Sequence, residues 1–207
     1  MRRVLFGGSF DPFHNAHLAM VEACLRRWPT ARCVLIPAAS PPHKLSSRQL
    51  PFEHRLAMLT QLAGGLGERV EVSGLEARRP PPAYSIDTVR AFRATEPGRP
   101  GFLLGADSLS QLASWREYQA LVGEARLIVV ARPEVDLEAA FADLSGPLGE
   151  ARVAQLRADR LEVAPSALSS TELRRRVAAG EELEGLIPEV ILQYLERHRL
   201  LEGLARP

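Results

Sequence analysis

The chain has 207 residues, of which 46% are hydrophobic and 25% are charged, and its formal net charge is +1. These values are ordinary for a globular domain with one sizeable core. A balanced charge excludes a broad electrostatic footprint for nucleic acid. The apolar runs are too short to span a bilayer, and the N-terminus lacks a secretory pattern. We expect a single domain over residues 1–207, in the cytoplasm, that binds neither nucleic acid nor a membrane.

The cysteine and lysine counts are both low. Cys24 and Cys33 are the only cysteines, and their spacing fits neither a disulfide framework nor a zinc site. We therefore predict no metal-binding residue set. Lys44 is the only lysine among the 26 lysine and arginine residues. A single lysine in an arginine-rich chain suggests a specific need for a compact ammonium group at that position.

Strand-like and helix-like segments alternate along the chain, which is typical of an α/β fold with an open, mostly parallel sheet and helices on both faces. Short apolar runs predict strands at residues 4–6, 33–36, 70–72, 102–104, 127–130 and 161–163. Helical periodicity and capping signals predict helices at about residues 16–27, 52–62, 85–94, 108–112, 117–122, 137–144, 169–179 and 188–200. Ser85 is expected to cap its helix, and loops are expected at residues 38–47, 78–82 and 145–149.

Two glycines end the first predicted strand, at the edge where open parallel sheets bind ligands. Gly7 and Gly8 would let backbone N–H groups approach phosphate oxygens, and the following helix N-terminus favours negative charge. His14 and His17 are three residues apart, so both face the same way and can donate hydrogen bonds to a polyphosphate. The alternative is a pair of histidines satisfied by local polar partners. Neither a dinucleotide fingerprint nor a Walker A loop is present.

A second candidate phosphate site lies near the C-terminus. Ser169, Ser170 and Thr171 offer hydroxyls and free N–H groups at a helix start, and Arg174 follows one turn later. Ser169 and Glu172 have capping-box spacing. Taken alone, the segment is more simply a well-capped helix with a solvated arginine face.

Both segments resemble motifs of the nucleotidylyltransferase superfamily. Residues 7–17 are similar to G-G-[ST]-F-D-P-x-H-x-G-H, and residues 168–174 are similar to I-S-S-T-x-[IV]-R; Ala16 stands where the family has glycine. The resemblance implies a single nucleotidylyltransferase domain with a Rossmann-like sheet and a helical C-terminal part at about residues 168–207. It also implies an ATP site made of Gly7, Gly8, Ser9, Phe10, Gly105, Asp107, Arg132, Ser169, Ser170 and Thr171.

Further segments resemble the nicotinate-mononucleotide adenylyltransferases of that superfamily. They are the P-P-H-K loop at 41–44, the Y-[ST]-x-D-T segment at 84–88, the G-x-D…W region at 105–118 and the R-P pair at 132–133. The implied mononucleotide site consists of Lys44, Tyr84, Ser85, Asp87, Trp115 and Tyr118. Trp115 would stack on a pyridine ring, although an ordinary core tryptophan is an equal alternative.

The resemblance implies transfer of AMP from ATP to nicotinate mononucleotide, with release of pyrophosphate, in NAD biosynthesis. Catalysis would depend on positioning and on charge stabilisation by His14, His17, Lys44 and Arg174. Mg²⁺ would bind mainly through the ATP phosphates. Alternative acceptors are nicotinamide mononucleotide, phosphopantetheine and flavin mononucleotide, and a non-catalytic nucleotide sensor is a further alternative motivated by Ala16. Either a monomer or a homo-oligomer is compatible with the sequence.

Overall fold

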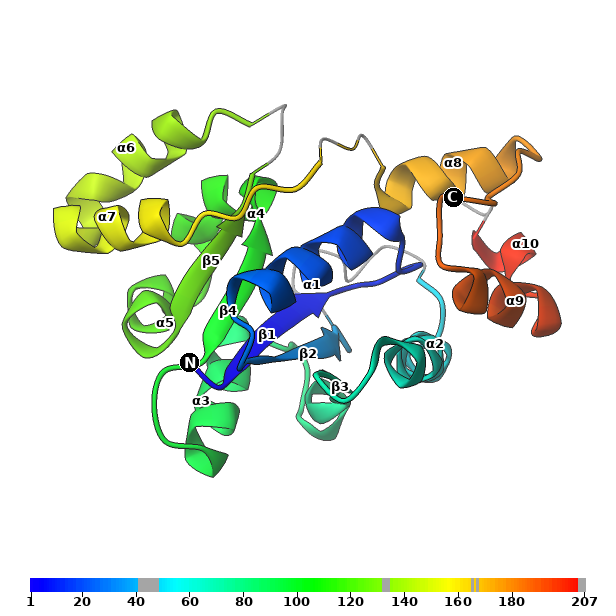
Figure 1. The fold of residues 1–207 in the computed structure, drawn as a ribbon, viewed down its shortest axis with the longest axis horizontal. Helices are drawn as coiled ribbons and strands as arrows, with labels where there is room; N and C mark the ends of the chain where they lie inside the picture. The colour runs from blue at the N-terminus through cyan, green and yellow to red at the C-terminus, as the bar shows by residue number, and fades with distance from the viewer. Residues whose placement is uncertain (41–48, 132–134, 165, 167, 205–207) are drawn as a thin grey trace.

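The computed structural model describes residues 1–40, 49–131, 135–164, 166 and 168–204. Its centre is a five-stranded, all-parallel sheet in the order β3-β2-β1-β4-β5 (Figure 1). The strands are β1 (Arg3–Gly8), β2 (Arg32–Pro37), β3 (Val70–Val72), β4 (Gly101–Gly105) and β5 (Arg126–Val130). After β3 the chain crosses to the other side of β1, so the strand order reverses between β1 and β4. Open sheets of this kind bind ligands at that point.

Helices connect the strands and extend the chain beyond β5. They are α1 (Asn15–Arg27), α2 (Phe52–Leu66), α3 (Ser85–Thr95), α4 (Ala106–Ser110), α5 (Tyr118–Glu124), α6 (Leu137–Leu148), α7 (Glu150–Ala158), α8 (Ser170–Ala178), α9 (Glu189–Arg197) and α10 (Leu201–Leu204). Two 3₁₀ turns, η2 (Leu75–Arg78) and η3 (Leu112–Ser114), add to these. No described helix has the length and apolarity that a bilayer crossing requires.

The sheet separates two apolar cores because side chains alternate across each strand. Val4 and Phe6 of β1 pack with α1, α2 and the C-terminal helices, whereas Leu5 packs with α3 to α7. All three side chains are at most 4% exposed. Figure 1 shows α6 and α7 at one end of the molecule and α8 to α10 at the other. The predicted α/β class and the helix-covered sheet are confirmed.

Three predicted segments are wrong, and one helix was not predicted. Residues 161–163 do not form a sixth strand; Leu161 makes one isolated parallel bridge with Val130, where β5 ends. Residues 145–148 are helical instead of a loop, because α6 continues through Pro147 to Leu148. The sequence also gave no sign of α7, and the last predicted helix is interrupted at Arg199, whose φ of 53° is left-handed.

The two predicted serine caps differ in outcome. Ser169 is the N-cap of α8, and its hydroxyl accepts a hydrogen bond from the Glu172 N–H at 3.1 Å. Ser85 is not a cap: Tyr84 holds the N-cap position of α3, and Ser85 is the first helical residue. Within this first turn the Asp87 N–H already donates to Tyr84 O at 3.1 Å, whereas the N–H groups of Ser85 and Ile86 precede the helical hydrogen-bond pattern.

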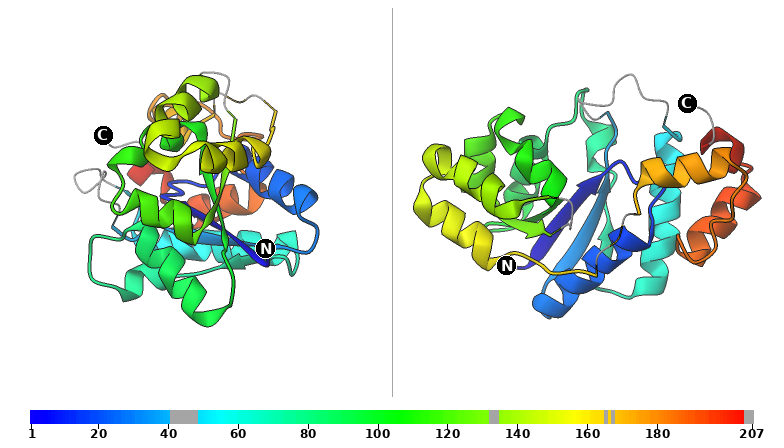
Figure 2. Two further views of the ribbon diagram at one scale, coloured as in Figure 1. Left: turned by 90° about the vertical axis from the view of Figure 1, so that its left-hand side faces the viewer. Right: turned by 90° about the horizontal axis from the view of Figure 1, so that it is seen from above.

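The C-terminal part, from α8 to α10, packs back onto the beginning of the chain. Asn15 at the start of α1 donates its backbone N–H to Leu186 O (3.0 Å) and its side-chain amide to Gly185 O (2.8 Å). α9 packs against α2, and α10 against α8. The view from above in Figure 2 shows these helices beside α1 and α2.

Candidate active site

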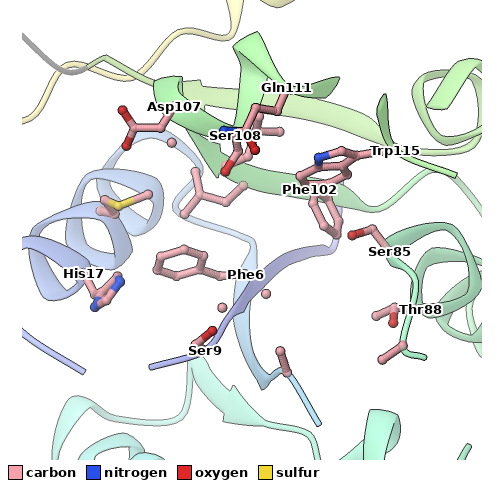
Figure 3. Close-up of a pocket in the computed structure, with 18 of the residues that line it drawn as sticks. Phe6, Ser9, His17, Ser85, Thr88, Phe102, Asp107, Ser108, Gln111 and Trp115 are labelled. Carbon is pink, nitrogen blue, oxygen red and sulfur yellow. The ribbon is translucent and has the colours of Figure 1, made fainter. Parts of the chain in front are cut away.

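A cavity of about 740 Å³ opens at the carboxyl ends of β1 and β4 (Figure 3). Residues 6–9 and 102–105 at the two strand ends form its floor, and the first turns of α1, α3 and α8 contribute to its walls. Its volume lies in the range of small-molecule sites. The structure therefore brings together segments that are far apart in sequence, at the edge where a ligand was predicted.

The glycine at position 8 is required by packing. A Cβ added to Gly8 would lie 2.9 Å from Phe10 Cε1. Phe10 has a left-handed φ of 48° and is 1% exposed, with its ring against Phe6 and His17 at centroid distances of 5.2 Å. Phe10 was predicted to bind ATP, but it lies in the core and supports the cavity floor without lining it.

The two predicted histidines stack on each other. His14 is the N-cap of α1, and its ring lies 3.7 Å from that of His17 with an interplanar angle of 22°. The His14 backbone N–H donates to His17 Nδ1 at 3.3 Å. An Nδ1 that accepts a hydrogen bond carries its lone pair, so the neutral ring holds its proton on Nε2. Both residues line the cavity, although His14 is only 1% exposed.

The start of α8 lies across the loop that follows β1. Ser169, Ser170 and Thr171 line the cavity. Ser170 Oγ donates to Pro12 O at 3.2 Å. The described structure thus joins the two predicted phosphate motifs into one wall.

Arg174 is held beside this wall by a buried carboxylate. Its Nη1 donates to Asp11 O (3.0 Å) and lies 3.2 Å from Asp11 Oδ2, and its Nη2 donates to Thr171 Oγ1 (3.3 Å). Asp11 is 1% exposed and also accepts the Leu50 N–H at 3.0 Å. Arg174 does not itself line the cavity; its neighbour Thr171 does.

Arg55, which was not predicted as a site residue, holds the segments that follow β1 and β2 in place. Its guanidinium donates to three backbone carbonyls: Ser9 O (2.7 Å), Ala38 O (2.8 Å) and Leu50 O (2.9 Å). The side chain is 2% exposed, and burial lowers its pKa, opposed by the charge of Asp11. Arg55 thereby couples the segments that follow β1 and β2 to the start of α2.

A second polar group missed by the sequence analysis lies in the cavity wall. Glu76 accepts hydrogen bonds from Thr88 Oγ1 (2.9 Å) and from the Ala39 N–H (3.4 Å). Arg79 donates to the same Thr88 hydroxyl at 3.2 Å. Burial raises the pKa of Glu76, and the Thr88 hydrogen bond opposes that rise. Glu76 and Thr88 both line the cavity.

The predicted mononucleotide residues separate into two groups. Tyr84, Ser85 and Trp115 line the cavity, and the Trp115 ring contacts Phe102 edge to face at 6.3 Å. Asp87 lines a smaller adjoining hollow of about 290 Å³, and Tyr118 lines neither. In Figure 3, Trp115, Ser85 and Thr88 lie on the side of the cavity away from His17.

The other predicted positions lie partly in the cavity and partly outside it. Gly105 and Asp107 line the cavity at the end of β4. Ala16 is half-buried in the first turn of α1 and does not line it, so its methyl group does not narrow the space. Lys44, the rest of the 41–44 loop and Arg132 lie outside the described residues.

The described residues offer few metal ligands, which suits a metal ion that is held mainly by substrate phosphates. These residues contain no group of three or more His, Cys, Asp or Glu side chains able to hold a metal ion. Two carboxylates, Asp107 and Glu76, line the cavity. Because Mg²⁺ keeps several waters and needs only one or two carboxylates besides substrate phosphates, the residues present fit it.

Comparison with known proteins gives consistent matches. The profile of the cytidylyltransferase-like family matches residues 5–176. A probable nicotinate-nucleotide adenylyltransferase of Symbiobacterium thermophilum is 39% identical over 203 residues, covering 96% of this chain and 94% of the relative. One from Bordetella petrii is 39% identical, covering 97% and 99%. Nicotinic acid mononucleotide adenylyltransferase of Plasmodium falciparum, complexed with NaAD, has a TM-score of 0.74 at 18% identity and 98% coverage of both chains.

Proposed function

The chain belongs to the cytidylyltransferase-like family and is related over nearly its whole length to nicotinate-nucleotide adenylyltransferases, and on this basis we propose that it transfers AMP from ATP to nicotinate mononucleotide. The products are nicotinate adenine dinucleotide, an intermediate of NAD biosynthesis, and pyrophosphate. The observation that carries the proposal is one continuous cavity from the histidine pair and α8 to Tyr84 and Trp115. Such a cavity can hold both substrates with their phosphates adjacent.

The reaction requires no covalent enzyme intermediate. A phosphate oxygen of the mononucleotide attacks the α-phosphorus of ATP in line, the new O–P bond forms, and the bond from the α-phosphorus to the bridging oxygen breaks as pyrophosphate leaves. Little bond chemistry then falls to the protein, so positioning and charge stabilisation provide the rate enhancement. Gly7, Gly8 and Ser9 form the backbone surface that receives the triphosphate, with Asp107 and Gly105 opposite.

We assign His17 to the charge that develops on the phosphates. The backbone contact to Nδ1 leaves Nε2–H as the donor of a neutral ring. A donor held in place before the reaction stabilises the transition state without reorganisation. His14, stacked on the same ring, serves the same phosphates.

Arg174 and the hydroxyls of residues 169–171 act on the β- and γ-phosphates from the same wall as the histidines. Asp11 orients the Arg174 guanidinium through the backbone carbonyl and the carboxylate. We include Lys44 in this set of cations, as the sequence resemblance implies. A Mg²⁺ ion carried by ATP would neutralise phosphate charge, with Asp107 as the carboxylate nearest to that role.

We further propose that residues 1–207 form one catalytic domain that functions in the cytoplasm, as a monomer or a homo-oligomer. Tyr84, Ser85 and Trp115 would receive the mononucleotide, with the Trp115 indole against the pyridine ring. Asp87 and Tyr118 lie outside the cavity wall and would act on the mononucleotide through their neighbours.

A pyrophosphate-release assay with ATP and Mg²⁺ tests the proposal. Nicotinate mononucleotide, nicotinamide mononucleotide, phosphopantetheine and flavin mononucleotide are supplied in turn, and the highest kcat/KM is expected for the first. A higher kcat/KM with another acceptor would assign the chain to that acceptor. Tight ATP binding without pyrophosphate release from any of the four would favour a nucleotide sensor.

A further inference from the structure

Arg116 stands out among the charged side chains of the cavity. It is the one arginine or lysine among the described residues that line the cavity, and it also lines the adjoining hollow with Tyr84 and Asp87. It follows Trp115, so it lies at the end of the cavity that the proposed function gives to the mononucleotide. Neither the predicted site nor the family motifs assign it a role.

The Arg116 guanidinium is only weakly engaged by protein groups. Its Nε lies 3.7 Å from Glu117 Oε1, longer than a hydrogen bond, and 56% of the side chain is exposed. The other oxygen of Glu117 accepts a bond of 2.7 Å from Arg90, which also lowers the pKa of Glu117. Among the described residues Glu117 is the one carboxylate paired with Arg116, through Nε, and this leaves the two Nη groups of the guanidinium for a ligand.

The position of the guanidinium is nevertheless defined. Arg116 Cζ lies 4.7 Å from the centroid of the Tyr84 ring, at cation–π distance. Tyr84 is the N-cap of α3, so the guanidinium packs on the side chain of the residue that begins that helix. A cation beside a helix N-terminus forms a site for an anion. The planar fork of arginine matches a carboxylate with two hydrogen bonds.

The position of Arg116, at the end of the cavity away from His17, indicates which anion it binds. The mononucleotide phosphate must reach the α-phosphorus of ATP, near the histidines and α8. The pyridine ring then lies toward Trp115 and Ser85, which Figure 3 shows across the cavity from His17. The anion at this end is therefore the ring carboxylate.

Resting on the proposed function, we infer that Arg116 is a specificity-determining residue that binds the carboxylate of nicotinate mononucleotide and thereby favours the acid over the amide. Nicotinamide mononucleotide has the same ribose phosphate but a neutral amide in place of the carboxylate. The amide forms no charge-assisted bidentate pair with a guanidinium. The preference for the acid is thus assigned to one side chain at the pocket rim.

The test compares kcat/KM for the acid and the amide in four forms of the full chain: wild type, Arg116→Gln, Arg116→Lys and the control Arg93→Gln. Arg93 is a half-exposed α3 arginine that pairs with Glu124 and does not line the cavity. Arg116→Gln is expected to lower kcat/KM for the acid about 10- to 100-fold, as for loss of a charge-assisted hydrogen bond. Its value for the amide should stay within about twofold, because the amide never used the charge. Arg116→Lys should restore part of the loss, and Arg93→Gln should change neither value.

Two results would overturn the inference. An equal loss for acid and amide would show that Arg116 serves the shared phosphate or the fold, and unchanged kcat/KM values for both substrates would show that it serves neither. The wild-type assay tests the proposed function independently of the variants: if the wild type releases no pyrophosphate with nicotinate mononucleotide, that function is contradicted. Calorimetric titration of the two mononucleotides still tests Arg116 in that case, since equal wild-type affinities for acid and amide refute its role.

Discussion

The orientation of His17 depends on one backbone contact. The His14 N–H fills Nδ1, and the stacked His14 ring limits rotation of the imidazole. Aromatic rings of Phe6, Phe10 and Phe13 surround it at 5.2–5.8 Å. A histidine in such a setting presents a single donor in a fixed direction, which is what stabilisation of a developing negative charge requires.

Replacing His17 by alanine should lower kcat by roughly two to three orders of magnitude, as for removal of one preorganised oxyanion donor. Pyrophosphate release at saturating substrates measures it. His198→Ala is the matched control, because His198 is exposed, stacks on Tyr194 and lies outside the cavity. A near-normal kcat in His17→Ala would refute the assigned role.

Glu76 should make stability fall with rising pH. Its pKa is raised in the folded state by burial, so the folded protein binds more protons than the unfolded chain above about pH 4.5. Stability is then lost as pH increases from that value through the folded pKa. In Glu76→Gln this contribution is absent. The unfolding free energy of wild type relative to the variant should therefore decrease between pH 4 and pH 7 in urea titrations.

The control for Glu76 is Glu162→Gln. Glu162 is 72% exposed and pairs with Arg160, so its replacement should leave the pH profile of wild type unchanged. Parallel profiles for wild type and Glu76→Gln would contradict the argument. Activity assays are not needed for this comparison.

At the residue scale, the sequence predicted the groups that line the cavity but not the buried groups that hold those segments in place. Gly8, His14, His17 and Ser169 stand in short motifs whose chemistry is local, and the structure places all four at one cavity. Arg55 acts on carbonyls up to 46 residues away, and such contacts leave no periodic or spacing signal. Glu76 lies between the strand predicted at 70–72 and the loop predicted at 78–82, and a single glutamate at such a position gives no signal of its own.

At the scale of elements, helix α2 supports the site through Arg55, which binds the backbone of the segments that follow β1 and β2. Replacing Arg55 by methionine should destabilise the protein by about 3 kcal/mol, because one buried and two partly buried carbonyls lose a charged donor. Urea unfolding measures the loss. Arg69→Met provides the comparison: Arg69 also donates to two carbonyls, but it is exposed, and the expected loss is below about 1 kcal/mol. Equal losses in both variants would refute the role of burial.

Element boundaries were predicted where a long apolar face or a cap exists. The five central strands and α1, α2, α3 and α8 were located within a few residues. α7 was missed because only Val153 and Leu156 among its nine residues are buried, which is too little for a recognisable stripe. Residues 161–163 failed as a strand because the neighbouring β5 ends at Val130 and offers no further partner.

For the whole molecule, the C-terminal part is expected to respond to ATP. A ligand that binds only the assembled wall stabilises it by about 2.7 kcal/mol at a hundredfold excess over Kd, or roughly 100-fold in amide exchange. A non-hydrolysable ATP analogue should therefore slow exchange in the first turn of α8 and at Gly7 and Gly8. Exchange at Val153 to Leu156 in α7, at the opposite end of the molecule (Figure 1), should not change. Equal protection of α7 would show a global effect instead of a local one.

The contact of Arg174 with Asp11 spans 163 residues. On a ribosome that adds about 5–20 residues per second, roughly 8 to 33 s separate the synthesis of these two partners. Throughout that interval the glycine and histidine motif is already made, while the start of α8 that completes the same wall does not yet exist. A nascent chain thus presents a half-built triphosphate site, which is completed only after residues 169–174 have been synthesised.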